Sequence, residues 1–438
     1  MKTLKYTMIL FFSFLLSLLS CSDSQIQIEK QNLQEEIVTP TLPEEEVPEE
    51  TEDPVVEENG SFDFDTGIAE ELRIRNGLPN FFAKAKSGKN ISVAYMGGSI
   101  TNQNGWRPIT FNWIKDRYPT ANFTEIEAAH SGTGIDFGAA RAKVDVLDKN
   151  PDLIFIEFRV NGGIADIARS TEGLVRLIRA HNPETDICFV YTIGEWMLDD
   201  LRQGKQYWIG KVMEEVANTY GIPSIDFGVE VVKLEKEGKL VFKAPAPEAG
   251  KLYFSKDGVH PKEDGYQLYA ETTIKGLKAM ENIDKPLMHD MPSPIKTDHF
   301  ENASLLSYDN MDVNANWETV DVNSDAIYRS DRERTNQMLR GAFKTNKEGE
   351  SLTINWNGVL IGFSSIPQGT GMEVEVSTDG KTPKKIILKE GSGAIKYGQF
   401  FYAPEVEAGS HTTTLKIIKL PNGSSFYSGQ FIIMDSPN

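Results

Sequence analysis

The chain has 438 residues, enough for two or three domains, and its hydrophobic content of 39% is enough to fill substantial cores. Its formal net charge is −19 at pH 7, which does not favour a nucleic-acid partner, because such a partner requires a basic face. The sequence also has no metal-ligand spacing, phosphate-binding glycine loop or dinucleotide fingerprint, so we expect no metal and no cofactor.

The first 21 residues have the pattern of a signal peptide. Lys2 and Lys5 precede an apolar stretch from Met8 to Leu19, which is too short for a comfortable membrane span. The stretch is followed by Cys21 in LLSC, which resembles the bacterial lipobox, where the Cys is lipidated and becomes the first residue after cleavage. We therefore expect a lipid anchor at this Cys. An ordinary cleaved signal peptide with a chance Cys is the alternative.

Residues 22–60 hold 13 Asp and Glu residues against one base, Lys30. The segment is poor in aromatic residues and contains several prolines. Such a sequence repels itself and cannot bury enough apolar surface to fold, so we expect a disordered spacer. With the lipid anchor, it would hold the folded part away from a membrane of the cell envelope, at the outer membrane on its periplasmic or surface side.

Residues 61–284 alternate between strand-like and helix-like segments. Apolar runs that predict strands lie at 91–97, 123–129, 152–160, 186–193 and 222–227. Amphipathic stretches that predict helices lie at 105–119, 136–150, 162–183 and 199–221. This pattern indicates an α/β domain with a parallel sheet and helices on both faces. Ligands bind at the carboxyl ends of the strands in such domains.

Ser99 stands at the carboxyl end of the first of these strands, directly after Gly97 and Gly98. Two glycines permit a sharp turn, so Ser99 is either a nucleophile or a residue that caps the next helix. A second feature favours the nucleophile. Asp257 stands three residues before His260 in FSKDGVHP, and this short turn can place a carboxylate behind an imidazole.

Two further loops offer hydrogen-bond donors where predicted strands end. AAHSGTG offers the backbone N–H of Gly132, and EFRVNGG offers the side-chain amide of Asn161. With the N–H of Ser99, three donors could converge on a developing negative oxygen. Taken singly, Gly132 also fits an ordinary loop, and Asn161 fits a turn before two glycines. Four such loops together favour a catalytic site.

In these four blocks the sequence resembles the SGNH hydrolases, also called the GDSL-type esterase and lipase superfamily. GGSIT is a variant of the Gly-Asp-Ser-Leu block, and HSGTG, the Asn161 loop and DGVHP match three later blocks. The resemblance implies a three-layer, flavodoxin-like domain. It implies Ser99 as nucleophile, His260 as base and Asp257 as the residue that orients the base. It also implies an oxyanion hole made by Ser99, Gly132 and Asn161.

The sequence departs from the family pattern at two positions. Gly98 replaces the usual Asp, and Gly162 replaces the Asp that normally follows the block-three Asn, which could loosen that loop or open the pocket. His130 and Arg159 are unusual neighbours of the site and are candidates for binding substrate, although such an Arg more often pairs with a local carboxylate. Trp196 follows another strand and would suit stacking on a sugar, with packing on the next helix as the alternative.

The pattern changes after residue 284. Residues 285–297 contain three prolines and are expected to be a linker. Residues 298–438 contain short, mostly alternating runs and a hairpin signal at Asp379-Gly380, which predict an all-β domain of the sandwich type, jelly-roll-like in outline.

Lipobox, acidic spacer, SGNH-type domain and β-sandwich together look like the polysaccharide-degrading lipoproteins of Bacteroidetes-type bacteria. By that resemblance we expect a serine esterase that removes O-acetyl groups from a polysaccharide or oligosaccharide. One alternative is an envelope glycan acyltransferase that uses the same triad, with a sugar hydroxyl in place of water. Another is a non-catalytic glycan-binding lipoprotein, against which the intact Ser99, Asp257 and His260 argue. The sequence does not identify the sugar or the acyl position.

Overall fold

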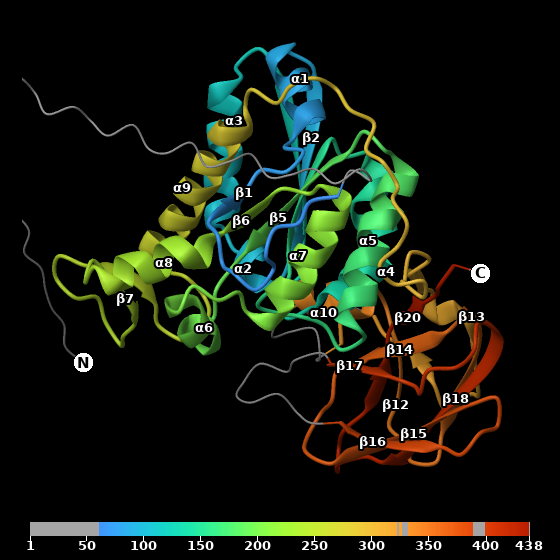
Figure 1. The fold of residues 1–438 in the computed structure, drawn as a ribbon. Coiled ribbons are helices and arrows are strands. Elements are labelled where there is room, and N and C mark those ends of the chain that lie inside the picture. Colours follow the sequence, from blue (N-terminus) through green and yellow to red (C-terminus); the bar gives the residue numbers. More distant parts are fainter. Residues whose placement is uncertain (1–60, 322–323, 326–331, 389–398, 438) are drawn as a thin grey trace, which may run out of the picture. The chain divides into compact units, whose positions relative to one another are not determined.

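The central sheet of the first domain determines where the strand ends come together. In this computed structural model, which describes residues 61–321, 324–325, 332–388 and 399–437, its six strands lie in the order β1-β6-β5-β4-β2-β3. Figure 1 shows the first domain in blue to yellow. All neighbours pair in parallel except β1 with β6. The strands are β1 (Leu72–Arg73), β2 (Asn90–Gly97), β3 (Asn122–Ala129), β4 (Leu153–Glu157), β5 (Asp186–Tyr191) and β6 (Ser224–Asp226).

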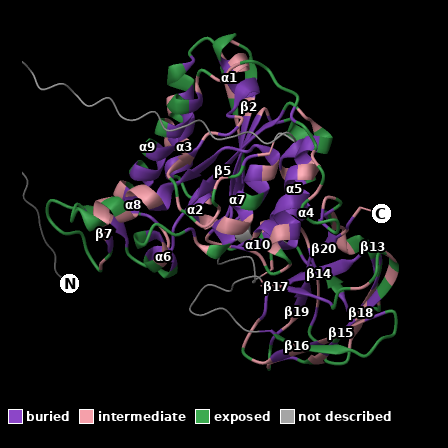
Figure 2. Cartoon of the chain, in the orientation of Figure 1, coloured by how far each residue is buried: buried purple, intermediate pink, exposed green. Residues whose placement is uncertain are grey.

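Helices cover both faces of this sheet, because its strands are apolar on both sides. One face carries α4 (Ile135–Asp145), α5 (Ile167–His181) and α7 (Trp208–Tyr220), and the other carries α1 (Pro79–Lys86), α3 (Trp106–Arg117), α8 (Phe227–Lys236) and α9 (Glu263–Met280). Shorter elements are α2 (Ser99–Asn102), α6 (Leu198–Arg202), the 3₁₀ turns Leu147–Lys149 and Glu195–Met197, and the parallel pair β7 (Leu240–Lys243) and β8 (Leu252–Ser255). Figure 2 shows the sheet buried between the helices, so the predicted three-layer arrangement is confirmed.

Antiparallel sheets form the second domain, as the alternating runs predicted. One sheet has the order β10-β13-β18-β15-β16, and a second has the order β17-β14-β20-β9. Side chains of both enclose one core, and β15 alternates strictly between fully and partly buried residues. The strands are β9 (Ser304–Leu306), β10 (Met311–Val313), β13 (Ser351–Gly358), β14 (Leu360–Ser365), β15 (Met372–Thr378), β16 (Lys384–Leu388), β17 (Gln399–Tyr402), β18 (Gly409–Lys419) and β20 (Phe431–Met434). A small sheet of β11 (Glu318–Thr319), β12 (Phe343–Thr345) and β19 (Phe426–Ser428), the 3₁₀ turn Tyr308–Asn310 and helix α10 (Arg332–Leu339) complete it.

The segment between the domains, residues 285–297, is hydrogen-bonded along the first domain. Two buried or half-buried side chains of α5 hold it. Glu172 accepts the N–H groups of Ile295 and Lys296 at 2.7 and 2.8 Å, and Arg176 donates to the carbonyl of Pro292 at 2.9 Å. A segment expected to be a plain linker is therefore attached to the first domain at several points.

The two domains also share apolar packing. Phe300, Ile432 and Met434 of the second domain are buried in the same cluster as the side chains of α4. The rings of Phe137 in α4 and Phe400 in β17 lie 4.6 Å apart between centroids. Burial of this continuous apolar surface makes each domain part of the other's core.

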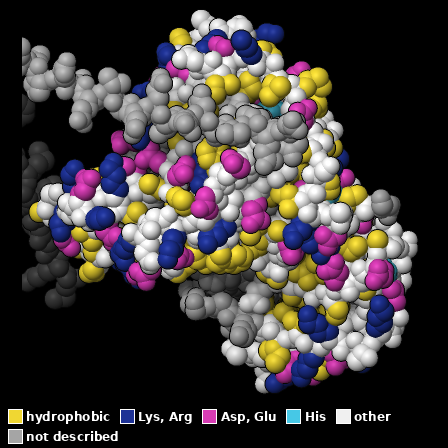
Figure 3. Space-filling model, in the orientation of Figure 1, with side chains coloured by type: hydrophobic (Ala, Val, Ile, Leu, Met, Phe, Trp, Pro, Cys, Tyr) yellow, Lys and Arg dark blue, Asp and Glu magenta, His cyan; other side chains and the backbone are white. Residues whose placement is uncertain are grey.

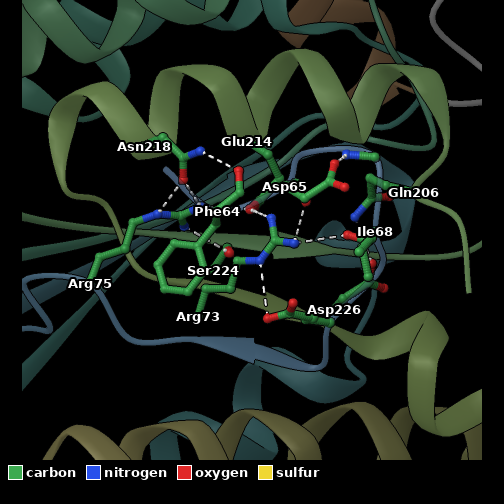
Figure 4. A network of polar contacts seen from close by, with 12 residues as sticks. Phe64, Asp65, Ile68, Arg73, Arg75, Gln206, Glu214, Asn218, Ser224 and Asp226 are labelled. Atoms are coloured by element: carbon green, nitrogen blue, oxygen red, sulfur yellow. Dashed lines mark hydrogen bonds and ion pairs between the residues drawn. The ribbon is translucent and has the colours of Figure 1, made fainter. Parts of the chain in front are cut away.

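A buried ion network fixes the start of the described chain to α7 (Figure 4). Glu214 accepts from Arg73, from Arg75 at 2.6 Å and from the hydroxyl of Tyr191 at 2.7 Å. Both arginines and Glu214 are almost fully buried. Glu214 is therefore the buried carboxylate that both arginines share, and Arg73 has a second, partly exposed ion-pair partner in Glu70 at 3.3 Å. Asn218, Ser224 and backbone carbonyls accept their other N–H groups.

Replacing that carboxylate should destabilise the fold strongly. We expect Glu214→Gln to lower the free energy of unfolding by about 3–5 kcal/mol, because Arg75 loses its buried counter-charge and Arg73 keeps only its partly exposed partner Glu70. The matched control is Glu215→Gln, at an exposed position one residue away, which should change the stability by no more than about 0.5 kcal/mol. Urea unfolding of the three proteins measures this, and equal effects of the two substitutions would contradict it.

Candidate active site

The first element of the site is the tight exit of β2 toward Ser99. A Cβ atom on Gly97 would lie 2.9 Å from the carbonyl oxygen of Glu157, and one on Gly98 would lie 2.0 Å from the Oδ1 atom of Asn161. A side chain at position 97 would displace the end of β4, and one at position 98 would displace the side chain of Asn161. The two glycines therefore let the nucleophile loop and the Asn161 loop pack directly against each other, with Ser99 beginning α2.

Ser99, His260 and Asp257 lie in one hydrogen-bonded series. The Oγ atom of Ser99 is 2.8 Å from Nε2 of His260, and Nδ1 of His260 is 2.8 Å from Oδ2 of Asp257. The serine comes from the start of α2, and the other two come from the loop before α9. This geometry lets the imidazole accept the serine proton while the carboxylate holds the opposite ring nitrogen.

The loop that carries the pair is ordered by the same carboxylate. Oδ1 of Asp257 accepts the N–H groups of Val259 and His260 at 2.9 and 2.8 Å, and the hydroxyl of Ser255 at 3.1 Å. Partial burial alone would raise the pKa of Asp257, but the hydrogen bonds from His260 and the two backbone amides hold that pKa well below its usual range. Asp257 is thus ionised and can stabilise an imidazolium. Sequence reasoning missed Ser255, whose hydroxyl also accepts the N–H of Gly258.

Two of the three predicted oxyanion donors are backbone N–H groups without a partner in the described part of the chain. The backbone N–H groups of Ser99 and Gly132 form no hydrogen bond with the described residues. The side chain of Asn161 packs on Gly98, and its buried Oδ1 atom has no partner in the described part of the chain. The N–H of His130 donates to the carbonyl of Gly97 at 2.9 Å, which ties the Gly132 loop to the Ser99 loop.

Gly162, where the sequence departs from the family pattern, closes a tight turn. Its φ of +60° is a left-handed conformation that favours glycine. Its N–H donates to the carbonyl of Phe158, and its carbonyl accepts from the N–H of Ile135, both at 2.7 Å. The substitution therefore does not leave the Asn161 loop loose.

Comparison with known proteins identifies this domain. Residues 95–268 match the model of the GDSL-like Lipase/Acylhydrolase family. This segment is a GDSL-like lipase/acylhydrolase domain. The chain is accordingly a carboxylic ester hydrolase. No curated protein sequence matches the chain.

Solved structures share the fold of nearly the whole chain. A two-domain esterase active on acetylated mannans, co-crystallised with mannopentaose, has a TM-score of 0.70 at 20% identity, over 85% of this chain and 98% of that one. A second structure of such an esterase has a TM-score of 0.67 at 19% identity, with the same coverage. An acetylxylan esterase from Geobacillus stearothermophilus covers 44% of this chain and 96% of its own, with a TM-score of 0.35 at 17% identity. The first two likenesses confirm the predicted combination of an α/β domain with a β domain.

Two candidate substrate-binding residues of the GDSL-like domain are buried away from solvent. Arg159 is 0% exposed, and its guanidinium contacts both carboxylate oxygens of Asp226, at 2.5 and 2.7 Å, as well as Gln206. It pairs with a carboxylate and has no free donor for a substrate. His130 is 7% exposed, and its Nε2 atom lies 3.5 Å from Asp145. Burial, and then the nearby Arg141, lower the pKa of His130 to about 2. It is therefore a neutral core residue and does not line an open pocket.

The third candidate, Trp196, follows a residue whose backbone contacts the loop of His260. Its side chain is half-exposed, and its ring covers Gly194, where a Cβ would lie 2.7 Å away. The N–H of the preceding Glu195 donates to the carbonyl of Gly258 at 2.8 Å, two residues from His260. A cavity of about 310 Å³ lies next to the loop of His260, and both polar and apolar residues line it, among them Gln103, Ile109, Pro261 and Tyr266. No group of metal-ligating side chains occurs among the residues that the structure describes.

A buried carboxylate that sequence reasoning missed lies beneath the nucleophile loop. Glu157 ends β4 and accepts the hydroxyls of Thr192 at 2.5 Å and Thr101 at 3.0 Å, with the N–H of Gly98 at 3.4 Å. Burial raises the pKa of Glu157 to about 7, although these hydrogen bonds act in the opposite direction. The sequence feature that could have revealed this buried carboxylate is a single acidic residue inside an otherwise apolar predicted strand.

The Glu157 carboxyl should make stability depend on pH. Its pKa in the folded state lies above its ordinary value of 4.5, so between about pH 4.5 and 7 the folded protein keeps a proton that the unfolded chain releases. The stability contributed by this group therefore falls as the pH rises through that window. We expect wild type to lose up to about 3 kcal/mol relative to Glu157→Gln between pH 4.5 and 8.

Urea unfolding across this pH range measures the difference between the two proteins. The buried His130 has the opposite dependence, because its pKa is lowered on folding, but it is present in both proteins and cancels in the difference. A Glu215→Gln control, at an exposed position, should give a curve parallel to wild type. Parallel curves for wild type and Glu157→Gln would contradict the prediction.

Proposed function

We propose that this protein is a serine esterase that removes acetyl groups from the hydroxyls of a polysaccharide or oligosaccharide. The observation that carries the proposal is the series from Ser99 Oγ through His260 to Asp257, with both contacts at 2.8 Å. The two-domain fold shared with an esterase active on acetylated mannans makes acetylated mannan the first substrate to test. The cavity next to the loop of His260 includes the polar side chains of Gln103, Asn104 and Gln267, which could hydrogen-bond the hydroxyls of a sugar.

In the first half-reaction the ester is cleaved and the enzyme is acetylated. Ser99 Oγ attacks the acetyl carbonyl carbon while His260 Nε2 accepts the serine proton. The carbonyl oxygen becomes an oxyanion, which the N–H groups of Ser99 and Gly132 and the amide of Asn161 stabilise. The bond between carbon and sugar oxygen then breaks, and the imidazolium returns its proton to the sugar oxygen.

In the second half-reaction water releases acetate. His260 accepts a proton from a water molecule, which attacks the acetyl-serine carbonyl, and the same donors hold the second oxyanion. The intermediate collapses, Ser99 recovers its proton and acetate leaves. The side chain of His260 is about one-third exposed, so water can reach it.

We propose in addition that Cys21 anchors the protein to a membrane of the cell envelope. This residue lies outside the described part of the chain, and the proposal rests on the LLSC sequence and the acidic segment after it. Among the described residues, no helix is both long and apolar enough to cross a membrane. An anchored enzyme would act on glycans at the cell envelope.

Removal of either reacting side chain should abolish acetate release. We expect Ser99→Ala and His260→Ala each to lower kcat on acetylated mannan by about 10⁴-fold or more, and the double variant to be no worse, because the residues act as one unit. His181→Ala, at an exposed position at the end of α5, is the matched control and should retain full activity.

Acetate should appear without any added acceptor glycan. Release that depends on a second glycan would identify a transferase. Normal turnover by Ser99→Ala would overturn the nucleophile assignment.

The anchor has a separate test. Cys21→Ser should prevent lipidation and move the full-length protein from the membrane fraction to the soluble fraction, with acetate release per molecule unchanged. The control is Cys188→Ala, because Cys188 is the other cysteine of the chain and is fully buried. If Cys21→Ser stays with the membrane like wild type, the anchor proposal is wrong.

A further inference from the structure

A buried aspartate connects the two oxyanion loops to the second domain. Asp136, in the first turn of α4, is 2% exposed. Its Oδ2 atom accepts the N–H groups of Ile164 and Ala165 at 2.9 and 3.0 Å, and the hydroxyl of Tyr402 at 2.9 Å. Two of these donors belong to the loop of the first domain that begins at Asn161, and the third belongs to β17 of the second domain.

Asp136 is in a position to fix both loops at once. It follows Gly132 by four residues, and its two amide donors follow Asn161 by three and four residues. The same two segments are joined by the hydrogen bond from the N–H of Ile135 to the carbonyl of Gly162. They pack so closely at Gly134 that a Cβ there would lie 2.5 Å from that carbonyl oxygen.

Tyr402 reaches Asp136 from a well-fixed position. β17 pairs with β14, where Tyr402 is opposite Gly362, and a Cβ on that glycine would lie 2.5 Å from the tyrosine ring. Phe400, two residues earlier, packs on Phe137 of α4. Burial, and then the Asp136 carboxylate, raise the pKa of Tyr402 well above its usual value, so the hydroxyl keeps its proton and donates.

We propose that the second domain positions the oxyanion hole, and that Tyr402 does so by holding Asp136, which in turn holds the loops of Gly132 and Asn161. Tyr402 is a positioning residue, because it acts through Asp136 and does not touch the reacting atoms. This inference rests on the proposed function, which assigns Gly132 and Asn161 to the oxyanion. Donors must lie within a few tenths of an ångström of their productive positions, so a small loop shift lowers turnover.

The test is turnover of 4-nitrophenyl acetate by the full chain, since this ester is too small to need a glycan-binding surface. We expect Tyr402→Phe to lower kcat about tenfold with KM nearly unchanged, because oxyanion contacts act mainly in the transition state. The matched control is Glu405→Gln. Glu405 lies three residues away and joins the domains through a 2.8 Å ion pair with Arg169, without contacting Asp136. Glu405→Gln should leave kcat within twofold of wild type.

A double-mutant cycle separates positioning from a general structural role. Asn161→Ala alone should lower kcat by about 10²–10³-fold. In that background Tyr402→Phe should cost less than its tenfold effect in wild type, because both act on the same loop. Equal effects in both backgrounds, a change in KM alone, or normal kcat in Tyr402→Phe would each overturn the inference.

Two further measurements keep the outcome interpretable. In folded Tyr402→Phe, hydrogen exchange at the amides of Ile164 and Ala165 should become faster, while exchange in α9 stays as in wild type. If Tyr402→Phe does not fold, Asp136→Asn replaces it and should lower kcat at least as much; unchanged kcat there would equally overturn the inference. Ser99→Ala is measured alongside. If Ser99→Ala is active, the proposed function is wrong. If Ser99→Ala is inactive but Tyr402→Phe has a normal kcat, only this inference is wrong.

Discussion

The contact between the segments that leave β2 and β4 is the constraint on which the site depends. These strands are parallel neighbours, with Gly97 opposite Glu157, so the chain segments after them meet at once. A residue with a side chain at position 98 would collide with Asn161. Because Gly98 has no side chain, the proposed nucleophile Ser99 and the proposed oxyanion donor Asn161 come to lie next to each other. A sheet of parallel strands thereby becomes a site that can receive an ester carbonyl.

Three carboxylates near this contact are placed in different surroundings and so have different properties. Asp257 accepts from its histidine and from backbone amides, which keeps it ionised behind the base. Asp136 is buried but accepts three hydrogen bonds, and it joins loops from two domains. Glu157 is buried with hydroxyl partners, and burial raises its pKa. The carboxylate of Asp257 can thus stabilise a charged imidazole, that of Asp136 attaches loops, and that of Glu157 supports the turn before Ser99.

The fold and the candidate site could be predicted from the sequence where the contacts that form them are local or follow from the order of the strands. Asp257 and His260 lie in one turn, so their spacing predicted their contact. Long apolar runs predicted the parallel sheet, and strand ends predicted that Ser99 and Asn161 would lie near each other, because parallel strands end at one edge. The lipid anchor remains a prediction, since Cys21 lies outside the described residues.

The remaining features depend on partners far away in the chain. Arg159 was a candidate for substrate binding, with pairing to a carboxylate as the alternative, and the partner that decides this, Asp226, is 67 residues further on. Tyr402 and Asp136 are 266 residues apart, and no local pattern links them. Glu157 was a charged residue in an apolar strand, and the polar groups that surround it come from two other segments, the turn with Gly98 and Thr101, and Thr192 directly after β5. Burial and long-range pairing of this kind become visible only once the tertiary fold is known.

The segment of residues 285–297 and the apolar packing beyond it bear on how this protein could be recombined with others. Multidomain enzymes are often treated as exchangeable modules joined by inert spacers. If the two domains were separated within this segment, the carboxylate of Glu172 would lose its two amide donors. Phe300 and Ile432 on one part, and the apolar side chains of α4 on the other, would become exposed to water. A chimaera that keeps the α/β part must therefore carry the spacer and a matching apolar partner for α4. For protein engineering, the smallest transferable unit is the pair of domains.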